Sequence, residues 1–456
     1  MKFTTLLKKI SKKRMDYFHK ARYIKYYEKL PIRKNVILLE QQRGKNPNGN
    51  IHYLVEELCK DSQFDQYEVY YVYSREKKKD YRDLLEGHRI NGVHLVRLES
   101  RKYYRLCASA EYLINDTSFL PFFIKKEGQK YLNTWHGTPL KCLGKQDNSG
   151  YHNLGNVQRN FIFSDLLLYP NQYMRNHMIE DYMLENLTDA RCLMAGYPRN
   201  SVFFDHESKK TIFNQLKESG LINESVEHVY AYMPTWRGTV SCVNKEMQTI
   251  YTMFYLLEIE KRLADDEILF VNLHPFVNDS IDYSVFKHIL PFPKQYETYE
   301  FLNVADVLIT DYSSVFYDFA NTRRKIVLFT YDADEYFADR GVYCSLNSLP
   351  FPKVETVRDL IAELRTPKNY DDSSFIEEYC SLDKYDISKK ILKSFLFDSK
   401  ELEILEIPKN GKDNVLIYAG NMAKNGITTS LLSLVNNIGL KKRNYFITFT
   451  VNKVTR

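Results

Sequence analysis

Short apolar runs alternate with amphipathic stretches along most of this chain. From residue 35 onward, runs rich in Val, Ile, Leu and Tyr have the length and composition of buried strands. Between them, apolar positions recur at helical spacing, as in residues 51–60. Strands that alternate with helices predict parallel sheets flanked by helices, which is an α/β fold.

The alternation divides into two consecutive series. The first contains predicted strands at residues 36–40, 69–73, 93–98, 112–115, 131–135 and 166–169. The second begins near Arg191, with predicted strands at residues 192–195, 229–233, 268–273, 307–310 and 326–330, and helices at 209–219, 246–262, 299–305, 314–321 and 357–364. These series predict two doubly wound, Rossmann-like domains, residues 35–190 and 191–400, facing each other across a cleft. A cleft between domains is the expected ligand site.

The last part of the chain departs from this pattern. Residues 401–413 are charged and contain Pro408 and Gly411, which predicts a linker. Residues 414–419, 427–437 and 445–451 then predict a strand, a helix and a strand. One such unit cannot bury a sheet alone, so residues 414–456 are interpreted as the start of a further, truncated domain of a longer, bifunctional protein. The alternative is a C-terminal extension docked on the second domain.

Composition narrows the class of protein. A chain of 456 residues with 44% hydrophobic and 27% charged residues is typical of a globular protein with more than one core. No apolar run approaches the roughly 18 residues of a membrane span, and the start lacks the apolar core of a secretory signal. The seven cysteines are scattered without C-x-x-C spacing, which predicts a reducing cytosol and argues against disulfides or a structural zinc site.

The net charge of +6 is concentrated at the start of the chain. Residues 1–34 contain twelve Lys or Arg against Asp16 and Glu28, and Phe3, Leu6 and Ile10 fall at helical spacing. A basic amphipathic leader suits the anionic inner face of a membrane, which predicts a cytoplasmic protein bound peripherally to that face. A solvated basic leader or a nucleic-acid arm would have similar charge. No nucleic-acid motif is recognisable, so no nucleic-acid partner is expected.

The first candidate for chemistry lies where a predicted strand ends. The run at 131–135 stops at Trp135, and His136, Gly137, Thr138 and Pro139 follow. Gly and Pro cannot continue a strand ladder, so His136 is predicted to lie at the carboxyl end of a strand, where α/β sheets bind ligands. A histidine there can accept a proton from a hydroxyl group near neutral pH. A turn histidine bonded only to nearby backbone would have the same pattern.

Four further motifs end strands of the second series and carry groups suited to phosphate. They supply Arg199 from residues 195–200, Thr235 and Trp236 from 233–238, His274 from 272–276, and Ser313, Ser314 and Asp318 from 308–318. Singly, these residues could form a surface ion pair, a strand stop or a helix cap. Together they predict a site for an anionic ligand such as a diphosphate. Arginine, histidine and helix-start amides would meet its charge without an obligatory metal ion.

A metal site is not expected at these strand ends. His136, His274 and Asp311 lack close ligand spacing, and no D-x-D pair stands at a comparable position. We therefore expect no obligatory cofactor.

These motifs, in this order, resemble the CDP-glycerol glycerophosphotransferase family of teichoic-acid polymerases and primases, which have a GT-B fold. The resemblance covers about residues 35–395 and rests on WHGTPLK at 135–141, GYPR at 196–199, PTWR at 234–237, HP at 274–275 and TDYSSVFYD at 310–318, with a further matching segment at 332–341. The family transfers a polyol phosphate from a CDP-polyol to an acceptor hydroxyl and releases CMP.

The resemblance implies roles for particular residues. His136 would be the general base and His274 a second catalytic group. The CDP-polyol would contact Gly137, Thr138, Pro139, Arg199, Thr235, Trp236, His274, Ser313, Ser314 and Asp318. The acceptor would be a polymer or lipid-linked glycan of a teichoic acid or capsule.

Two departures from the family pattern leave the identity of the polyol open: glycerol, ribitol or another. Asn272 stands where many relatives have a basic residue, and residues 342–345 replace a more acidic run. Residues 420–432 resemble the opening of a nucleotide-sugar glycosyltransferase. Two alternative functions remain: a GT-B glycosyltransferase or epimerase that uses a nucleotide sugar, and a non-catalytic, membrane-bound scaffold.

Overall fold

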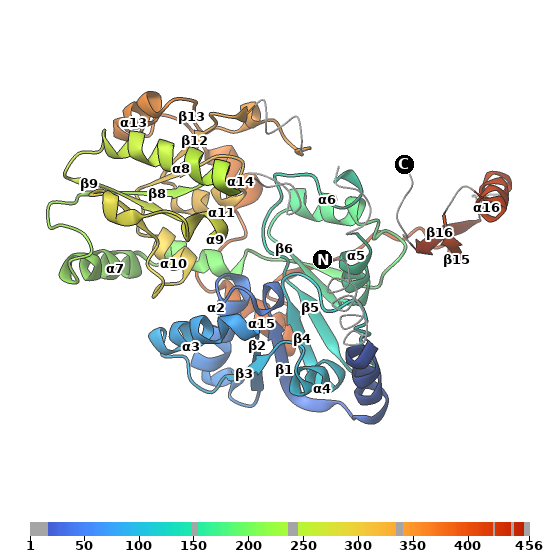
Figure 1. Cartoon of the computed structure of the whole chain (residues 1–456). Helices are drawn as coiled ribbons and strands as arrows, with labels where there is room; N and C mark the ends of the chain where they lie inside the picture. The colour runs from blue at the N-terminus through green and yellow to red at the C-terminus, as the bar shows by residue number, and fades with distance from the viewer. Residues whose placement is uncertain are drawn as a thin grey trace, which may run out of the picture.

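Two mainly parallel sheets, each covered by helices, form most of the molecule (Figure 1). The computed structural model describes residues 17–147, 154–235, 245–333, 341–422, 425–438 and 442–450. One sheet has eight strands and the other has six. The predicted pair of doubly wound sheets is therefore confirmed.

The first sheet has the strand order β14-β7-β6-β5-β4-β1-β2-β3. Alternate residues of one interior strand, β1, enter different cores: Ile37 and Leu39 lie in one hydrophobic cluster, and Val36 and Leu38 in another. Because strand side chains alternate between faces, this strand is buried on both sides. The strands are β1 (Arg33–Glu40), β2 (Glu68–Tyr73), β3 (His94–Arg97), β4 (Ala110–Asn115), β5 (Lys130–Asn133), β6 (Leu166–Tyr169), β7 (Arg191–Met194) and β14 (Glu403–Glu406).

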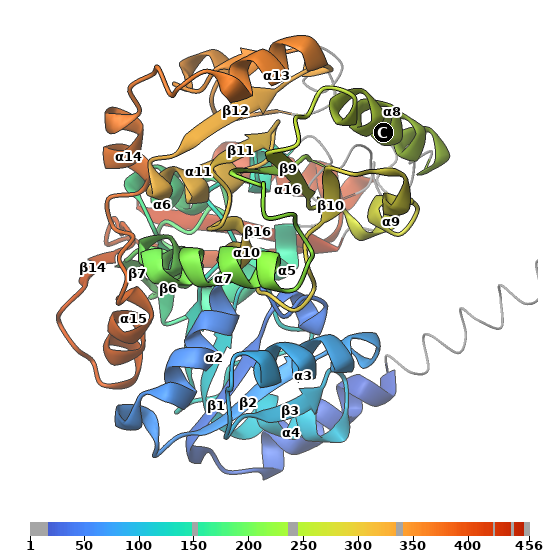
Figure 2. The same cartoon turned by 90° about the vertical axis from the view of Figure 1, so that its left-hand side faces the viewer.

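Helices cover both faces of this sheet. They are α2 (Asn50–Lys60), α3 (Lys78–Gly87), α4 (Arg101–Ser109), α5 (Leu154–Phe163), α6 (Gln172–Asp181) and α15 (Ile387–Leu396). The last of these follows the second domain in sequence yet packs against α2, beside the first sheet (Figure 2). The chain thus returns to its first domain after completing the second.

The second sheet is parallel throughout, in the order β10-β9-β8-β11-β12-β13. Its strands are β8 (His228–Met233), β9 (Glu267–Val271), β10 (Ile289–Pro291), β11 (Val307–Thr310), β12 (Lys325–Phe329) and β13 (Lys353–Val354). Its helices are α7 (His206–Glu218), α8 (Lys245–Glu260), α9 (Pro275–Asn278), α10 (Thr298–Leu302), α11 (Val315–Phe319), α13 (Val357–Arg365) and α14 (Ser373–Tyr379).

Both sheets change their winding direction beside their first strand. In the first sheet β1 lies between β2 and β4, and in the second β8 lies between β9 and β11. Loops at the carboxyl ends of such neighbouring strands diverge and leave a crevice. The site described below is lined by the loops after β8, β9 and β11 of the second sheet and by the loop after β5 of the first.

Two predictions about sheet membership were wrong. The strand predicted at 192–195 to open the second series is β7, which pairs in parallel with β6 of the first sheet. Within the predicted linker, β14 pairs antiparallel with β7. The order of strands and helices along the sequence does not determine which sheet a strand joins. β14 is a short edge strand with glutamates at both ends, so its sequence looks like a linker.

The start of the described chain is a helix over residues 17–29 that packs on the first domain. Tyr23 is buried in the core beneath α4, and its hydroxyl donates to the carbonyl of Ile124 at 2.7 Å. The predicted amphipathic positions Phe3, Leu6 and Ile10 lie outside the described residues. No helix in the described ranges combines the length and apolar character needed to cross a bilayer.

The predicted strand–helix–strand unit near the C-terminus is confirmed. It consists of β15 (Asp413–Asn421) and β16 (Arg443–Thr450), which pair in parallel, with α16 (Gly426–Asn437). The unit lies beside the first domain, where Asn414 donates to the carbonyl of Asn186 at 2.6 Å (Figure 1). It is therefore not docked on the second domain.

Candidate functional site

Two histidines from different domains line one pocket of about 490 Å³. His136 follows β5 of the first sheet, and His274 follows β9 of the second. Carboxyl ends of strands from both domains thus open into one space. The pocket is lined by Trp135, His136, Gly137, Thr138, Pro139, Leu140, Lys141, Leu143, Pro234, Thr235, Asn272, Leu273, His274, Tyr312, Ser313 and Ser314.

Hydroxyl groups from the second domain line the pocket at the switch point of its sheet. Thr235 follows β8, and its backbone N–H donates to Asp311 Oδ1 at 2.8 Å, which joins the ends of β8 and β11. Ser314 precedes α11, but its hydroxyl forms no capping bond with that helix. The hydroxyl of Ser313 accepts only a long bond of 3.5 Å from the N–H of Val315. These serine hydroxyls can therefore bond phosphate oxygens of a ligand.

The orientation of His136 leaves one ring nitrogen available as a base. Its Nδ1 lies 3.0 Å from the carbonyl oxygen of Asp116. Because a carbonyl only accepts, Nδ1 must carry the proton, and Nε2 holds the lone pair. The surrounding protein and the nearby Arg199 guanidinium lower the pKa of His136 below its usual value. The imidazole is therefore neutral near pH 7 and can accept a proton.

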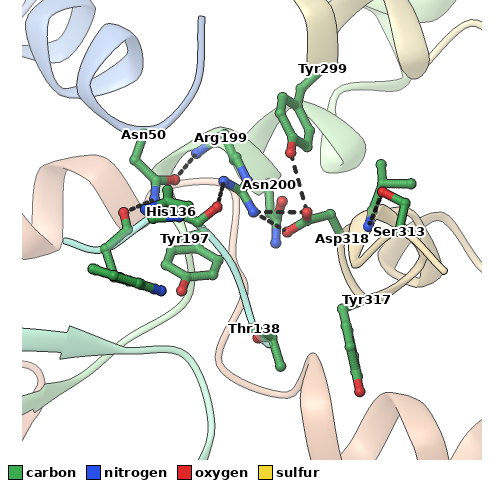
Figure 3. A network of polar contacts seen from close by, with 12 residues as sticks. Asn50, His136, Thr138, Tyr197, Arg199, Asn200, Tyr299, Ser313, Tyr317 and Asp318 are labelled. Atoms are coloured by element: carbon green, nitrogen blue, oxygen red, sulfur yellow. Dashed lines mark hydrogen bonds and ion pairs between the residues drawn. The ribbon is translucent and has the colours of Figure 1, made fainter. Parts of the chain in front are cut away.

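The turn that carries His136 is strained and is held by contacts from α2. Trp135 has a φ of 50°, which is uncommon for a bulky residue. Its carbonyl accepts a bond from Asn50 Nδ2 at 3.2 Å and one from Thr134 Oγ1 at 3.0 Å. Asn50 also accepts a bond from the backbone N–H of Arg199 at 3.4 Å (Figure 3). The buried amide of Asn50 therefore fixes the turn against two elements.

Arg199 and Asp318 form a buried ion pair behind the pocket. Arg199 Nη2 lies 2.8 and 3.0 Å from the two carboxylate oxygens of Asp318, and the residues are 5% and 3% exposed. Arg199 Nη1 also donates to the carbonyl of His136 at 2.8 Å. The guanidinium lies over the rings of Tyr197 and Tyr299 (Figure 3). The pair thus links α11 of the second domain to the turn of the base, and neither residue lines the pocket.

Gly137 allows the two domains to approach closely at this point. Its φ is 155°, and a Cβ atom here would lie 3.4 Å from Arg199 Nη2 and 3.6 Å from Ser314 Oγ. A side chain would enter the space between the base turn and the serine hydroxyls.

Most of the residues predicted from sequence meet in this pocket. His136, Gly137, Thr138, Pro139, Thr235, His274, Ser313 and Ser314 line it. Trp236 and the segment 334–340 lie outside the described residues. Sequence reasoning missed Lys141 and Tyr312 as lining residues. Lys141 belongs to the same motif as His136. Its position two residues after Pro139 could have indicated that it lines the same pocket.

Fold and site together define an enzyme of the two-domain GT-B class. Residues 23–396 match the family model of CDP-Glycerol:Poly(glycerophosphate) glycerophosphotransferase, and the chain belongs to this family.

Curated relatives agree with this assignment. The chain is 30% identical over 388 residues to a teichoic acid poly(glycerol phosphate) polymerase of Bacillus spizizenii, covering 80% of this chain and 93% of that protein. It is 29% identical to a teichoic acid glycerol-phosphate transferase of Staphylococcus aureus, covering 81% and 95%. It is 27% identical to a teichoic acid poly(glycerol phosphate) polymerase of Bacillus subtilis, of which it spans about half, 49%.

A solved structure shares the fold. The wall teichoic acid polymerase TagF superposes with a TM-score of 0.70 at 22% identity, covering 85% of this chain and 98% of that one. The expected GT-B fold is thereby confirmed.

Proposed function

We propose that this chain transfers glycerol phosphate or ribitol phosphate from a CDP-polyol to a hydroxyl of a growing cell-surface polymer and releases CMP. The observation that carries this proposal is the pocket that combines His136 of the first domain with His274, Ser313 and Ser314 of the second. Membership of the glycerophosphotransferase family supports the reaction class and a CDP-glycerol type of donor.

In the proposed reaction His136 acts as the general base. Nε2 takes the proton of the acceptor hydroxyl, and the hydroxyl oxygen attacks the phosphorus that carries the polyol. A new phosphorus–oxygen bond forms, the bond to the bridging pyrophosphate oxygen breaks, and CMP leaves with that oxygen. The base therefore needs a neutral imidazole with Nε2 facing the pocket, which the bond from Nδ1 to Asp116 favours.

The second domain would hold the donor. Thr235, Ser313 and Ser314 offer hydroxyls, and His274 offers a ring nitrogen, around the place of the diphosphate. Lys141 adds a cationic side chain from the first domain. Groups fixed around a departing phosphate stabilise its developing charge. Trp236 stays a proposed donor contact.

Arg199 and Asp318 would act on the donor through the residues that they position. Their charges already neutralise each other, so the guanidinium is engaged before any ligand binds. We therefore interpret the predicted phosphate contact of Arg199 as indirect, through the carbonyl of His136.

A panel of donors tests the proposed function. The full chain is incubated with CDP-glycerol, CDP-ribitol and UDP-sugars together with a polyol-phosphate acceptor, and CMP and UDP are measured. We expect CMP from at least one CDP-polyol, lost in His136→Ala and kept in His228→Ala, whose histidine is exposed and outside the pocket. Release of UDP alone would instead indicate a sugar transferase.

We also propose that the enzyme works at the inner face of the membrane, where the polymer or lipid-linked acceptor would be met. Tyr17 and Phe18 are largely exposed on the helix at 17–29, which lies within the basic leader of residues 1–34. Such a combination suits anionic lipid surfaces.

Removal of residues 1–16 tests this localisation and leaves Tyr23 in its core. We expect weaker sedimentation with anionic vesicles, most clearly at low salt. Equal sedimentation of both forms would contradict the membrane role.

A further inference from the structure

A second group of histidines and carboxylates lies where α2, α3 and α10 meet, apart from the residues that line the pocket. His52 and Glu56 are four residues apart on α2, so they share a face of that helix. His88 follows α3 directly. One possible ligand atom from each of these three residues lies within 4.8 Å of the others.

Within the described part of the chain, neither ring nitrogen of His52 has a hydrogen-bond partner. The residue is 0% exposed, and both Nδ1 and Nε2 are buried and unpaired. Buried polar atoms normally have partners, because leaving them unpaired is costly. A buried imidazole with two unpaired ring nitrogens, beside a carboxylate, is suited to bind a metal ion.

His88 is held between carboxylates of the two domains. Its Nδ1 lies 3.8 Å from Glu56 Oε1, and its Nε2 lies 3.3 Å from Glu300 Oε2 on α10. Histidines that bind metals usually donate their second ring N–H to a carboxylate, which fixes the ring. Glu300 stands in this relation to His88.

Lys60 is the competing partner in the group, because its ammonium donates to Glu56. Its side chain is 50% exposed, so it can turn into solvent when Glu56 takes another partner.

We propose that His52, Glu56 and His88 bind one divalent transition-metal ion of the Zn²⁺ class, with Glu300 orienting His88. Two imidazoles and one carboxylate form a donor set that Zn²⁺ prefers, and water would complete the coordination. The site is separate from the donor pocket and is not part of the proposed transfer reaction.

The ion would stabilise the contact between the two domains. Glu297, the N-cap residue of α10, accepts bonds from the N–H of Gly49 at 2.9 Å and from the hydroxyl of Tyr53 at 2.7 Å. These contacts involve the same part of α2 that carries His52. A metal bound to α2 and His88 would strengthen the adjoining link from His88 to Glu300.

Metal titration of the full chain, without an affinity tag and stripped with chelator, tests the proposal. We expect one Zn²⁺ per chain by calorimetry, and visible absorption bands of a four-coordinate site when Co²⁺ is added. His52→Ala and Glu56→Gln should each weaken binding at least tenfold. If the unmutated chain binds no stoichiometric Zn²⁺, the proposed site is wrong. It is equally wrong if both variants bind Zn²⁺ as tightly as the unmutated chain.

Two controls separate this site from other effects. Glu227, His228 and Asp266 form another cluster of suitable side chains, but an exposed one, so His228→Ala should keep the binding. Loss of binding in His228→Ala instead would overturn the proposal.

Glu56→Gln keeps the shape of the side chain but loses the charge that faces Lys60 and His88, so its melting temperature is compared with chelator and with Zn²⁺ in the same variant. Added Zn²⁺ should raise the melting temperature of the unmutated chain alone.

Discussion

The two walls of the pocket are built on different physical principles. The first-domain wall, His136 to Pro139, is a strained turn whose carbonyls and ring are fixed by Asn50, Arg199 and Asp116. The second-domain wall, Thr235, His274, Ser313 and Ser314, consists of half-buried polar side chains at the ends of three strands. A proton acceptor has to be held in one orientation, whereas a flexible diphosphate is bound by several adaptable groups.

The largest expected effect is the loss of the base on the first-domain wall. His136→Ala should lower the transfer rate by about 10²–10⁴-fold, because general base catalysis typically contributes that much. Donor binding, measured by calorimetry with CDP-glycerol, should change little. A near-normal rate would show that another group takes the proton.

Breaking the ion pair behind the pocket should mainly affect stability. Asp318→Asn leaves the Arg199 charge buried without its partner, which typically costs about 3–5 kcal/mol. Denaturant unfolding measures this change. The exposed pair of Lys210 and Glu207 is the matched control, and Glu207→Gln should leave the unfolding midpoint unchanged. Equal midpoints for both variants would contradict the structural role of Asp318.

Asn50 should influence the rate without contacting the substrate. Asn50→Ala removes a bond that holds the strained carbonyl of Trp135, so the position of His136 becomes less defined. We expect roughly a tenfold lower kcat, as for misplacement of a reacting group, with KM for the donor nearly unchanged. A raised KM with unchanged kcat would assign Asn50 to donor binding instead.

The serines of the second-domain wall should have the smallest individual effects. Ser314→Ala removes one hydrogen bond to the donor, worth about 1 kcal/mol, and should raise KM about fivefold with little change in kcat. Ser201→Ala is a suitable control, because that hydroxyl bonds the carbonyl of Pro198 outside the pocket. A large fall in kcat for Ser314→Ala would mean that this wall also positions the reacting atoms.

The pH dependence sharpens the same comparison. Since the surrounding protein and Arg199 lower the pKa of His136, its neutral form should persist below the usual histidine value of 6.5. The transfer rate should therefore fall on acidification only with an apparent pKa below 6.5. A rate that already falls above that value would indicate a protonated, cationic His136.

The sequence predicts the strand ends well, because local patterns determine them. β6 and β11 have their predicted bounds, and His136, His274 and Ser314 follow strands as expected. In both sheets the loops after these strands lie where α/β folds bind ligands, so the residues that line the pocket could be predicted without coordinates.

The contacts behind the pocket could not be predicted in the same way. Asn50 lies 85 residues from Trp135, and Arg199 lies 119 residues from Asp318. No periodicity or motif connects such positions. A sequence shows that Arg199 is cationic but not whether its partner is a ligand or a buried carboxylate. The sheet membership of β7 and β14 depends on long-range pairing for the same reason.

A crystal structure of His136→Ala with CDP-glycerol would test the central claim most directly. We expect the diphosphate to lie against Ser313, Ser314 and His274, with the polyol phosphorus facing the space that the imidazole leaves. A donor bound away from the second-domain wall, or with its phosphorus turned from residue 136, would contradict it.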